Sequence, residues 1–343
     1  MFGERIKRGI VPYLFSKCSV TALSRLTGMT LVSVYYHMVC DDEVPHTKHL
    51  YPHKNTSQFR DDLDYLASQY DIVSLSDVLV HVETGKTLPE RALLLTFDDG
   101  FREMHDVAAP ILQRKGVPAT FFICSACIDN ETLCYMHKGS VIAEHLLRYR
   151  PAGAFAAARK ALGIQDGPME EIVSAVLSLG YPERAEIDLF ALLLDIDLDE
   201  YRLKQRPYLS SDQIRNLLKA GFTVGAHSID HPIYALLPLE EQLLQTVTSV
   251  RQIRSRFSLT YGAFAFPSTD AGVTKKYFSE IEKSGLVNVC FGTGAMMRDD
   301  MASLLHRCSL EKPVMPGERI LAMEYARKLY RMATGKDTVR RKE

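Results

Sequence analysis

Two adjacent carboxylates follow a short apolar run near the middle of the first half of the chain. The run Leu93–Phe97 precedes Asp98, Asp99 and Gly100. A continuous apolar run of this length is typical of a buried strand in a parallel sheet. Neighbouring acids at the end of such a strand repel each other and lose solvation, which favours a role with a cation or in a reaction. A solvated Asp-Gly turn is the alternative interpretation.

Two histidines stand at the end of a second predicted strand. The segment Gly221–Ala226 is followed by His227 and, four residues later, by His231. Imidazoles at this spacing can converge on one metal ion. Together with the strand-ending acids they predict a three-ligand catalytic metal site with an open position for water.

At this point the chain resembles the NodB-type polysaccharide deacetylases, carbohydrate esterases that remove acetyl groups from N-acetylated sugars. Thr96–Gly100 resembles the first motif of that family, and His227–Pro232 resembles the second. Gly262–Pro267 resembles the strand that carries the third motif. The resemblance extends from about residue 31 to residue 310 and implies a distorted (β/α) barrel of about seven strands.

The resemblance also implies a divalent metal, commonly zinc, and a division of roles among the motif residues. Asp98 is expected to be the general base, while Asp99, His227 and His231 bind the metal. The metal would polarise an amide carbonyl and activate a water, whose proton Asp98 takes. A backbone N–H near Ser268 would donate to the oxyanion of the tetrahedral intermediate.

Several positions depart from the family pattern. Ala265 stands where the third motif usually has an arginine that orients the catalytic aspartate, and Ser268 stands at its aromatic position. A later motif usually includes tryptophan, which this chain lacks. Pro267 and Ser268 are nevertheless expected to lie against the substrate.

The general acid has two candidates. The final family motif usually supplies a histidine, and the nearest match here contains His306 and Arg307. Strand alternation lets only one of these two face the barrel interior, so Arg307 can instead replace the missing arginine and contact substrate. His37, at the end of the predicted strand Leu31–Met38, is the second candidate acid, with a structural histidine as the alternative.

The surrounding elements alternate between strands and amphipathic helices, which predicts a parallel sheet closed into a barrel with its active residues at the carboxyl ends of the strands. Helix boundaries are marked by a capping threonine at Thr56, by Gly116 as a C-cap, and by a capping box from Ser210 to Gln213. The further predicted strands are Ile72–Leu75, Ala119–Cys124, Val224–Ala226, Ala263–Phe266, Val287–Phe291 and Leu304–Cys308, and the predicted helices include Thr56–Gln69, Leu239–Arg256 and Thr274–Ser284.

We divide the chain into a basic N-terminal segment (1–28), a barrel (29–312) and a basic C-terminal helical tail (313–343). Residues 128–207 interrupt the barrel between the two metal motifs and have helical spacing of apolar residues. A connection there leaves the fourth strand at its carboxyl end, so we interpret it as a helical cap over the active face. A packing elaboration or a dimerisation surface is the alternative, and the sequence does not fix the oligomeric state.

The net charge of −1 argues against a nucleic-acid-binding protein. Positive charge is concentrated in the two tails, and the C-terminal tail has apolar residues spaced as in an amphipathic helix, including Ile320, Met323 and Met332. Peripheral contact with an anionic membrane is therefore one interpretation of the tails, and solvated ends are the other.

The seven cysteines form no paired framework, which favours free thiols in a reducing compartment. The spacing Cys124-x-x-Cys127 leaves a redox role as an alternative. The apolar stretch Gly9–Phe15 is too short for a convincing signal peptide, and no segment has the roughly 20 apolar residues of a membrane span. We therefore expect a cytoplasmic protein, with membrane association through the tails as a variant.

These observations predict a metal-dependent hydrolase that removes N-acetyl groups from an N-acetylated sugar in a polysaccharide, oligosaccharide or glycan precursor. The altered third motif keeps two alternatives open. One is hydrolysis of a non-sugar amide or imide on the same fold, and the other is a catalytically idle sugar-binding protein. Retention of both Asp98 and Asp99 speaks against the idle form, since a binder needs no base beside the metal.

Overall fold

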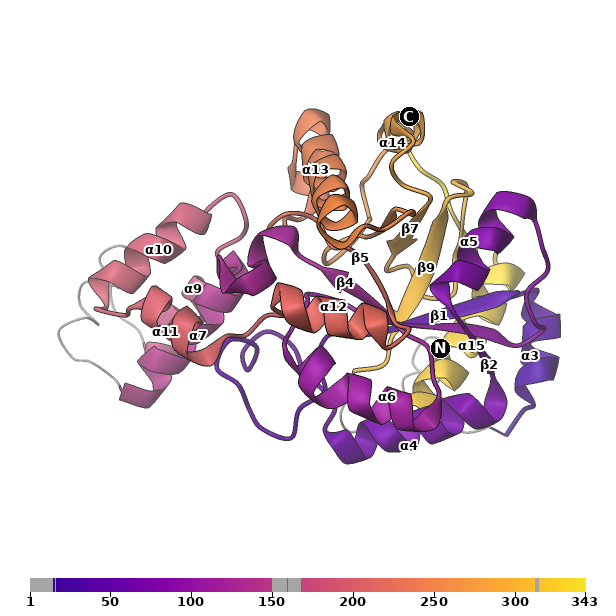
Figure 1. Ribbon diagram of the computed structural model, residues 1–343, viewed down its shortest axis with the longest axis horizontal. Coiled ribbons are helices and arrows are strands. Elements are labelled where there is room, and N and C mark those ends of the chain that lie inside the picture. The colour runs from indigo at the N-terminus through magenta and orange to yellow at the C-terminus, as the bar shows by residue number, and fades with distance from the viewer. Residues whose placement is uncertain (1–14, 16, 150–158, 160–167, 312–314) are drawn as a thin grey trace.

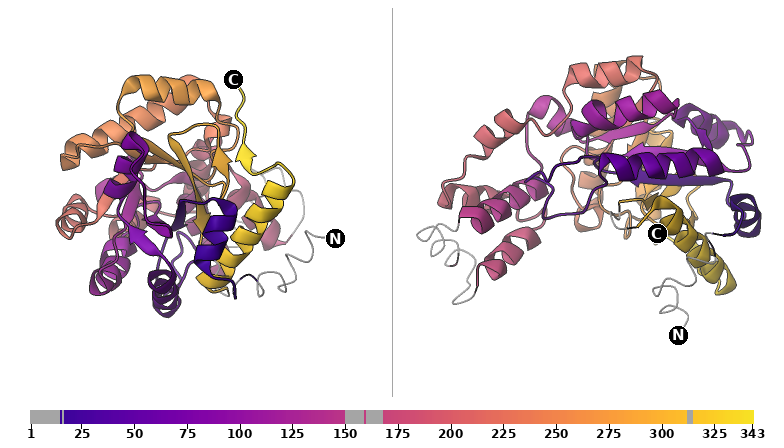
Figure 2. Two further views of the ribbon diagram at one scale, coloured as in Figure 1. Left: turned by 90° about the vertical axis from the view of Figure 1, so that its right-hand side faces the viewer. Right: turned by 90° about the horizontal axis from the view of Figure 1, so that it is seen from below.

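A computed structural model describes residues 15, 17–149, 159, 168–311 and 315–343. Its centre is a closed ring of seven parallel strands surrounded by helices, which confirms the predicted (β/α) barrel (Figures 1 and 2). The strands of the ring are β1 (Leu31–Tyr36), β3 (Ala92–Phe97), β4 (Thr120–Ile123), β5 (Thr223–Ala226), β6 (Ala263–Ala265), β7 (Val289–Gly292) and β9 (Leu304–Ser309).

The ring closes where the first strand pairs with the third and the last. Around the barrel the order is β1, β9, β7, β6, β5, β4 and β3, and β3 returns to β1. Leu31 pairs with Ala92 in the closing contact, and Ser33 pairs with Arg307 on the other side of β1. The short strand β2 (Asp71–Val73) pairs with the start of β3 and stands beside the ring. All pairs in the ring are parallel, so every strand presents its carboxyl end to the same face.

Alternation along the strands separates an interior from an exterior layer. Leu94, Phe122 and Phe291 belong to one buried apolar cluster inside the barrel. Their neighbours, such as Phe97 and Phe121, point outward into the larger core beneath the helices. The helices around the barrel are α3 (Val20–Thr27), α4 (Thr56–Gln69), α5 (Leu75–Thr84), α6 (Ala109–Lys115), α12 (Ser211–Lys219), α13 (Leu239–Phe257), α14 (Lys275–Ser284) and α15 (Gly317–Ala333).

The helix boundaries follow the sequence signals with one correction. The capping box from Ser210 to Gln213 is present, and Gly116 ends α6 with a φ of 65°. The prediction that Thr56 caps α4 is wrong, because Asn55 is the N-cap and accepts the Gln58 N–H at 2.8 Å. Both residue types cap helices well, but the Thr56 hydroxyl donates a hydrogen bond to Asp41 instead.

In the part of the segment between β4 and α12 that the structure describes, four α-helices gather at one side of the barrel (Figure 1). They have an apolar cluster of their own, which includes Ile142, Ile172 and Phe190. The helices are α7 (Tyr135–Tyr149), α9 (Met169–Ser178), α10 (Arg184–Leu193) and α11 (Leu198–Gln205). The helical composition of the segment is as expected, while its interpretation as a cap and the domain boundaries stay predictions.

The C-terminal tail packs against the barrel. Helix α15 lies on α3 and α4, and its Ile320 and Met323 are buried there, so these two side chains are not available to a membrane. A small parallel pair that was not predicted, β8 (Arg298–Asp299) with β10 (Thr338–Val339), holds the chain beyond α15. Residues 1–14 of the predicted basic N-terminal segment lie outside the described residues.

Candidate active site

Three predicted metal ligands meet at the carboxyl ends of β3 and β5. Asp99 Oδ1 lies 3.4 Å from His227 Nε2 and 3.2 Å from His231 Nε2. Two ligands of a tetrahedral zinc ion, each at about 2.0–2.1 Å from the metal, stand about 3.3 Å apart. The arrangement therefore matches the spacing that a bound ion requires.

Local backbone geometry and burial support this cluster. Asp99 and His231 adopt left-handed conformations with φ of 76° and 67°, which turn both side chains toward one point. Asp99 is 1% exposed, and its Oδ1 has no hydrogen-bond partner. A buried carboxylate oxygen without a donor is costly unless something else compensates it. The residues present thus fit a divalent cation.

Charge around Asp99 keeps it ionised. Burial alone would raise its pKa, but the neighbouring His231 and His227 side chains lower the pKa well below the ordinary range. His227 is fixed by its Nδ1, which lies 2.9 Å from the Ala265 carbonyl oxygen, so Nδ1 carries the proton and Nε2 faces the cluster. This is how metal-binding histidines are usually oriented.

Asp98 is held by a buried arginine from the last strand. Arg307 donates two parallel hydrogen bonds of 2.7 Å to the two carboxylate oxygens of Asp98, and a third of 2.9 Å to Thr96 Oγ1. Its guanidinium also lies over the rings of Tyr35 and Phe122. Burial raises the pKa of Asp98, but Arg307 outweighs it and the pKa is lowered. Arg307 therefore faces the barrel interior and occupies the role left open by Ala265.

His306 points away from this centre, as strand alternation requires once Arg307 faces inward. Its Nδ1 accepts the Gly294 N–H at 3.0 Å, and its Nε2 lies 3.0 Å from Asp299 Oδ2. Arg341 neutralises Asp299 and Asp270 in the same network. The expectation that His306 is a general acid does not fit this geometry, because none of its described contacts reaches Asp98 or Asp99.

His37 lies beside the centre and is paired with Glu311. Its Nδ1 contacts Glu311 Oε2, and the Glu311 carboxylate also accepts the N–H of Met38 at 3.0 Å. Burial lowers the pKa of His37, but the charge and hydrogen bond of Glu311 raise it to about 9. His37 is therefore protonated near neutral pH. Sequence reasoning missed Glu311, whose signal is an acid two residues beyond the end of β9.

Comparison with known proteins agrees with this geometry. The family model "Polysaccharide deacetylase" matches residues 85–289, which is more than half of the chain.

The chain belongs to the polysaccharide deacetylase family.

Relatives and solved structures extend the comparison. Over 75 residues the chain is 35% identical to the poly-beta-1,6-N-acetyl-D-glucosamine N-deacetylase of Escherichia coli K12, a match that covers 22% of this chain and 11% of that protein. The Streptococcus pyogenes deacetylase PplD has a TM-score of 0.54 at 14% identity and covers 86% of this chain and 97% of its own. IcaB from Ammonifex degensii has a TM-score of 0.52 at 16% identity, with the same coverage. The structural likeness shows the shared fold.

In this deacetylase-family chain, the residues that follow the strand of the third motif have an arrangement of their own. Pro267 is buried and Ser268 is exposed at the carboxyl end of β6, where Ser268 has a φ of 55°. Asp270, two residues on, is fixed by Arg341, which lies two residues beyond β10. No described side-chain contact joins Ser268 to Asp99, so its place near an oxyanion stays a prediction.

A tyrosine that sequence reasoning missed also contacts the candidate metal ligands of this family member. Tyr51 Oη lies 2.7 Å from Asp99 Oδ2, and its ring stacks on His37 with centroids 4.4 Å apart. On its other side lies His137 of α7, in the segment between the two metal motifs. The segment before Tyr51 has no periodic pattern that would have singled out this residue.

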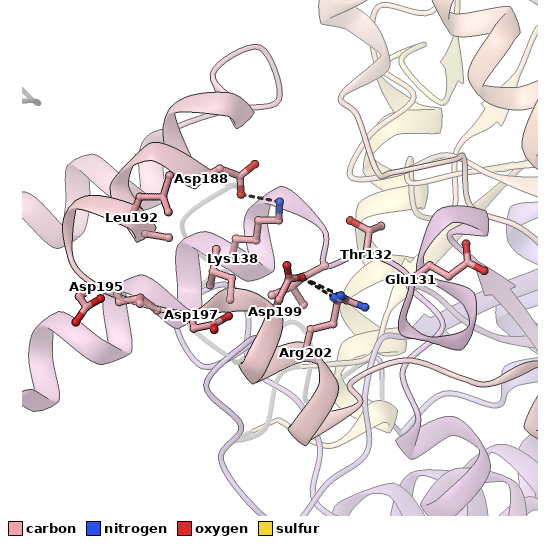
Figure 3. A pocket seen from close by; sticks show the side chains of 13 residues that line it. Glu131, Thr132, Lys138, Asp188, Leu192, Asp195, Asp197, Asp199 and Arg202 are labelled. Atoms are coloured by element: carbon pink, nitrogen blue, oxygen red, sulfur yellow. Dashed lines mark hydrogen bonds and ion pairs between the residues drawn. The ribbon is translucent and has the colours of Figure 1, made fainter.

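A surface hollow of about 590 Å³ lies among the helices of that segment (Figure 3). Two ion pairs lie in its lining, one of 2.7 Å between Lys138 and Asp188 and one of 2.8 Å between Arg202 and Asp199 on α11. Glu131 and Asp195 also line it, which leaves an excess of negative charge, and no residue of the Asp99 cluster belongs to its lining.

Among the described residues, each helix is either too short or too polar to span a bilayer.

Proposed function

We propose that this protein is a metal-dependent N-deacetylase acting on an N-acetylated sugar in a polysaccharide, oligosaccharide or glycan precursor. The observation that carries the proposal is a buried, arginine-held carboxylate, Asp98, directly beside the three convergent ligand residues. A divalent ion in this oxygen and nitrogen donor set would supply Lewis-acid chemistry, and zinc is its default occupant.

Each residue has a defined task in amide hydrolysis. Asp98 accepts the proton of the attacking water, and Arg307 keeps Asp98 ionised and oriented for this. His37 donates a proton to the leaving amine, since Glu311 holds it in its acid form. A backbone N–H near Ser268 would stabilise the oxyanion. The Arg307 contact also speaks against the idle sugar-binding alternative, because a binding protein has no use for an oriented base.

The decisive experiment combines metal analysis with acetate release. The purified protein would be loaded with zinc and tested on N-acetylated oligosaccharides of several lengths, with non-sugar acetamides as a parallel set. Acetate release from the sugars supports the proposal. Release only from the non-sugar amides supports the alternative amide hydrolase, and metal binding without any release contradicts both.

The pH dependence should reveal His37. Because its pKa is raised to about 9 from an ordinary 6.5, the acid form prevails below pH 9 and kcat/KM should fall above it. Glu311→Gln removes the charge that raises this pKa, so the alkaline limb should move to lower pH. The measurement is kcat/KM against pH for both proteins, with the exposed Glu282→Gln as control. An unmoved limb in Glu311→Gln would exclude His37 as the acid.

The acidic hollow is proposed to hold sugar units beyond the reacting one. Carboxylates accept hydrogen bonds from sugar hydroxyls, and losing one such bond costs about 0.5–1.5 kcal/mol, or roughly two- to tenfold in kcat/KM. Glu131→Gln with Asp195→Asn should therefore lower kcat/KM on long oligosaccharides and spare short ones, with metal content unchanged. Asp195 has a left-handed φ of 54°, which asparagine tolerates. Equal values on all lengths, or the same effect in Asp64→Asn on α4, would contradict the assignment.

Cellular location stays a prediction, as does membrane contact through the tails. The helical segment is proposed to shape substrate access, but deleting the whole segment would be a poor test of this role. It would remove His137, which lies next to Tyr51, and would expose residues that pack against the segment, such as Met38 and Phe101. Substitutions inside the hollow separate substrate choice from these effects.

A further inference from the structure

We propose that Tyr51 is a positioning residue for the metal ligand Asp99, and that the helical segment holds Tyr51 through His137 and Tyr208. This inference rests on the proposed metal site. It gives the segment between the two metal motifs a task inside the reaction centre, in addition to any role at its surface.

Four contacts form one continuous chain. Cys134 N lies 3.1 Å from Tyr208 Oη, and Tyr208 Oη lies 2.5 Å from His137 Nδ1. His137 Nε2 lies 3.4 Å from Tyr51 Oη, and Tyr51 Oη lies 2.7 Å from Asp99 Oδ2. His137 and Tyr208 are at most 1% exposed, so water does not compete for these groups.

The chemistry of the two ends is consistent with one direction of donation along the chain. An ionised carboxylate only accepts, so the Tyr51 hydroxyl must donate to Asp99, and its oxygen is left to accept from His137. At the far end the Cys134 N–H only donates, so Tyr208 accepts from it, and its own proton is available for donation to His137 Nδ1. In this arrangement Nε2 of His137 carries the proton that Tyr51 accepts, and Nδ1 accepts from Tyr208.

This direction has a consequence for Asp99. Its Oδ2 is occupied by the Tyr51 hydroxyl, whereas Oδ1, which faces His227 and His231, has no hydrogen-bond partner. Tyr51 thereby holds the carboxylate in the rotation that aims Oδ1 at the cation. Hydrogen-bonding partners of metal ligands typically change metal affinity about 10–100-fold when they are removed.

Tyr51 also couples the two sides of the centre. Its ring stacks on His37 with an interplanar angle of 24°, so one side chain touches both the proposed acid and a metal ligand. A shift of α7 would move His137, then Tyr51, and then both groups. The segment 128–207 can therefore affect the site without contacting substrate.

The test is a metal titration of stripped protein, which requires no substrate. Tyr51→Phe should bind zinc about 10–100-fold more weakly than wild type in competition with a chelator, and its cobalt complex should have a changed visible absorption spectrum. The matched control is Tyr325→Phe on α15, which removes another buried hydroxyl bond, at 3.2 Å to Ser24, far along the fold from Asp99. This control should keep wild-type metal affinity.

Variants of His137 test the same inference at a second residue, so that it does not depend on Tyr51→Phe alone. In His137→Gln, the side-chain amide would lie near the position of His137 Nε2 and could still donate to Tyr51. His137→Gln should therefore retain more metal affinity than His137→Leu. Thermal unfolding of the metal-free proteins establishes that each variant folds. Equal affinity of wild type, Tyr51→Phe and His137→Leu would overturn the inference, as would equal losses in His137→Gln and His137→Leu.

The outcomes separate this inference from the proposed function. If the wild type binds metal and the Tyr51 effect is present but no acetamide is hydrolysed, the function fails and the inference stands. If acetate is released and Tyr51→Phe matches Tyr325→Phe, the inference fails alone. A wild-type protein that binds no divalent metal would overturn both.

Discussion

Replacing Asp98 by asparagine is expected to lower acetate release by about 10²–10⁴-fold, while the protein keeps its metal. The amide cannot take a proton from the attacking water, and Asp98 is not among the convergent ligands. The measurement is turnover of the zinc-loaded protein together with its metal-to-protein ratio. Asp212→Asn, which removes one partner of a surface pair with Arg215, is the control and should leave both values unchanged.

The same substitution should also destabilise the protein, because Arg307 is fully buried and would lose its counter-charge. Breaking a buried ion pair on one side typically costs about 3–5 kcal/mol. Adding Arg307→Gln should recover stability without recovering activity, which separates the loss of a base from the loss of a fold. Wild-type turnover in folded Asp98→Asn would show that another group is the base.

Replacing His231 by alanine is expected to remove both the bound metal and the activity. Only two of the three convergent ligands would remain, and the metal-bound state would lose a strong imidazole donor. The measurement is the metal-to-protein ratio after dialysis. His145→Ala on α7, which removes a half-buried histidine outside the cluster, should retain the wild-type ratio.

Thermal unfolding gives a second readout for His231→Ala. A metal that binds only the native state raises the unfolding temperature, so zinc should stabilise wild type and leave the variant unchanged. Asp99→Asn should behave in the same way. Full metal content in folded His231→Ala would place the metal elsewhere in the chain.

The sequence predicted those parts of the site whose signal is local. Asp98 and Asp99 directly follow a strand, and His227 and His231 follow another, so strand parity and the common carboxyl-end face were enough to bring them together. The barrel followed from the alternation of strands and helices. Small shifts, such as the cap at Asn55 in place of Thr56, arose because neighbouring residues of similar capping strength cannot be ranked from local preference.

The partners of these residues were not predictable because their contacts are remote in sequence. Alternation established that only one of His306 and Arg307 faces inward, but it could not say which, since that depends on the register of β9 against β1. Glu311 reaches His37 across 274 positions. Tyr51 lies in a segment without regular secondary structure, and His137 lies on α7, outside the barrel. In neither place does a hydrophobic periodicity indicate which side chain points at the proposed metal ligands.

The order of the strands around the ring has a consequence for synthesis of the chain. Residues 99–231 contain the proposed metal ligands, whereas Arg307 follows Asp98 by 209 positions and arrives with the strand that completes the ring. A nascent chain therefore gains the means to capture an ion well before its catalytic carboxylate has a counter-charge or His37 has Glu311. Such long-range closure is a slow step in folding. Catalysis thus becomes a property of the completed barrel, because Asp98 and His37 acquire their partners only with the last strand of the ring and the residues after it.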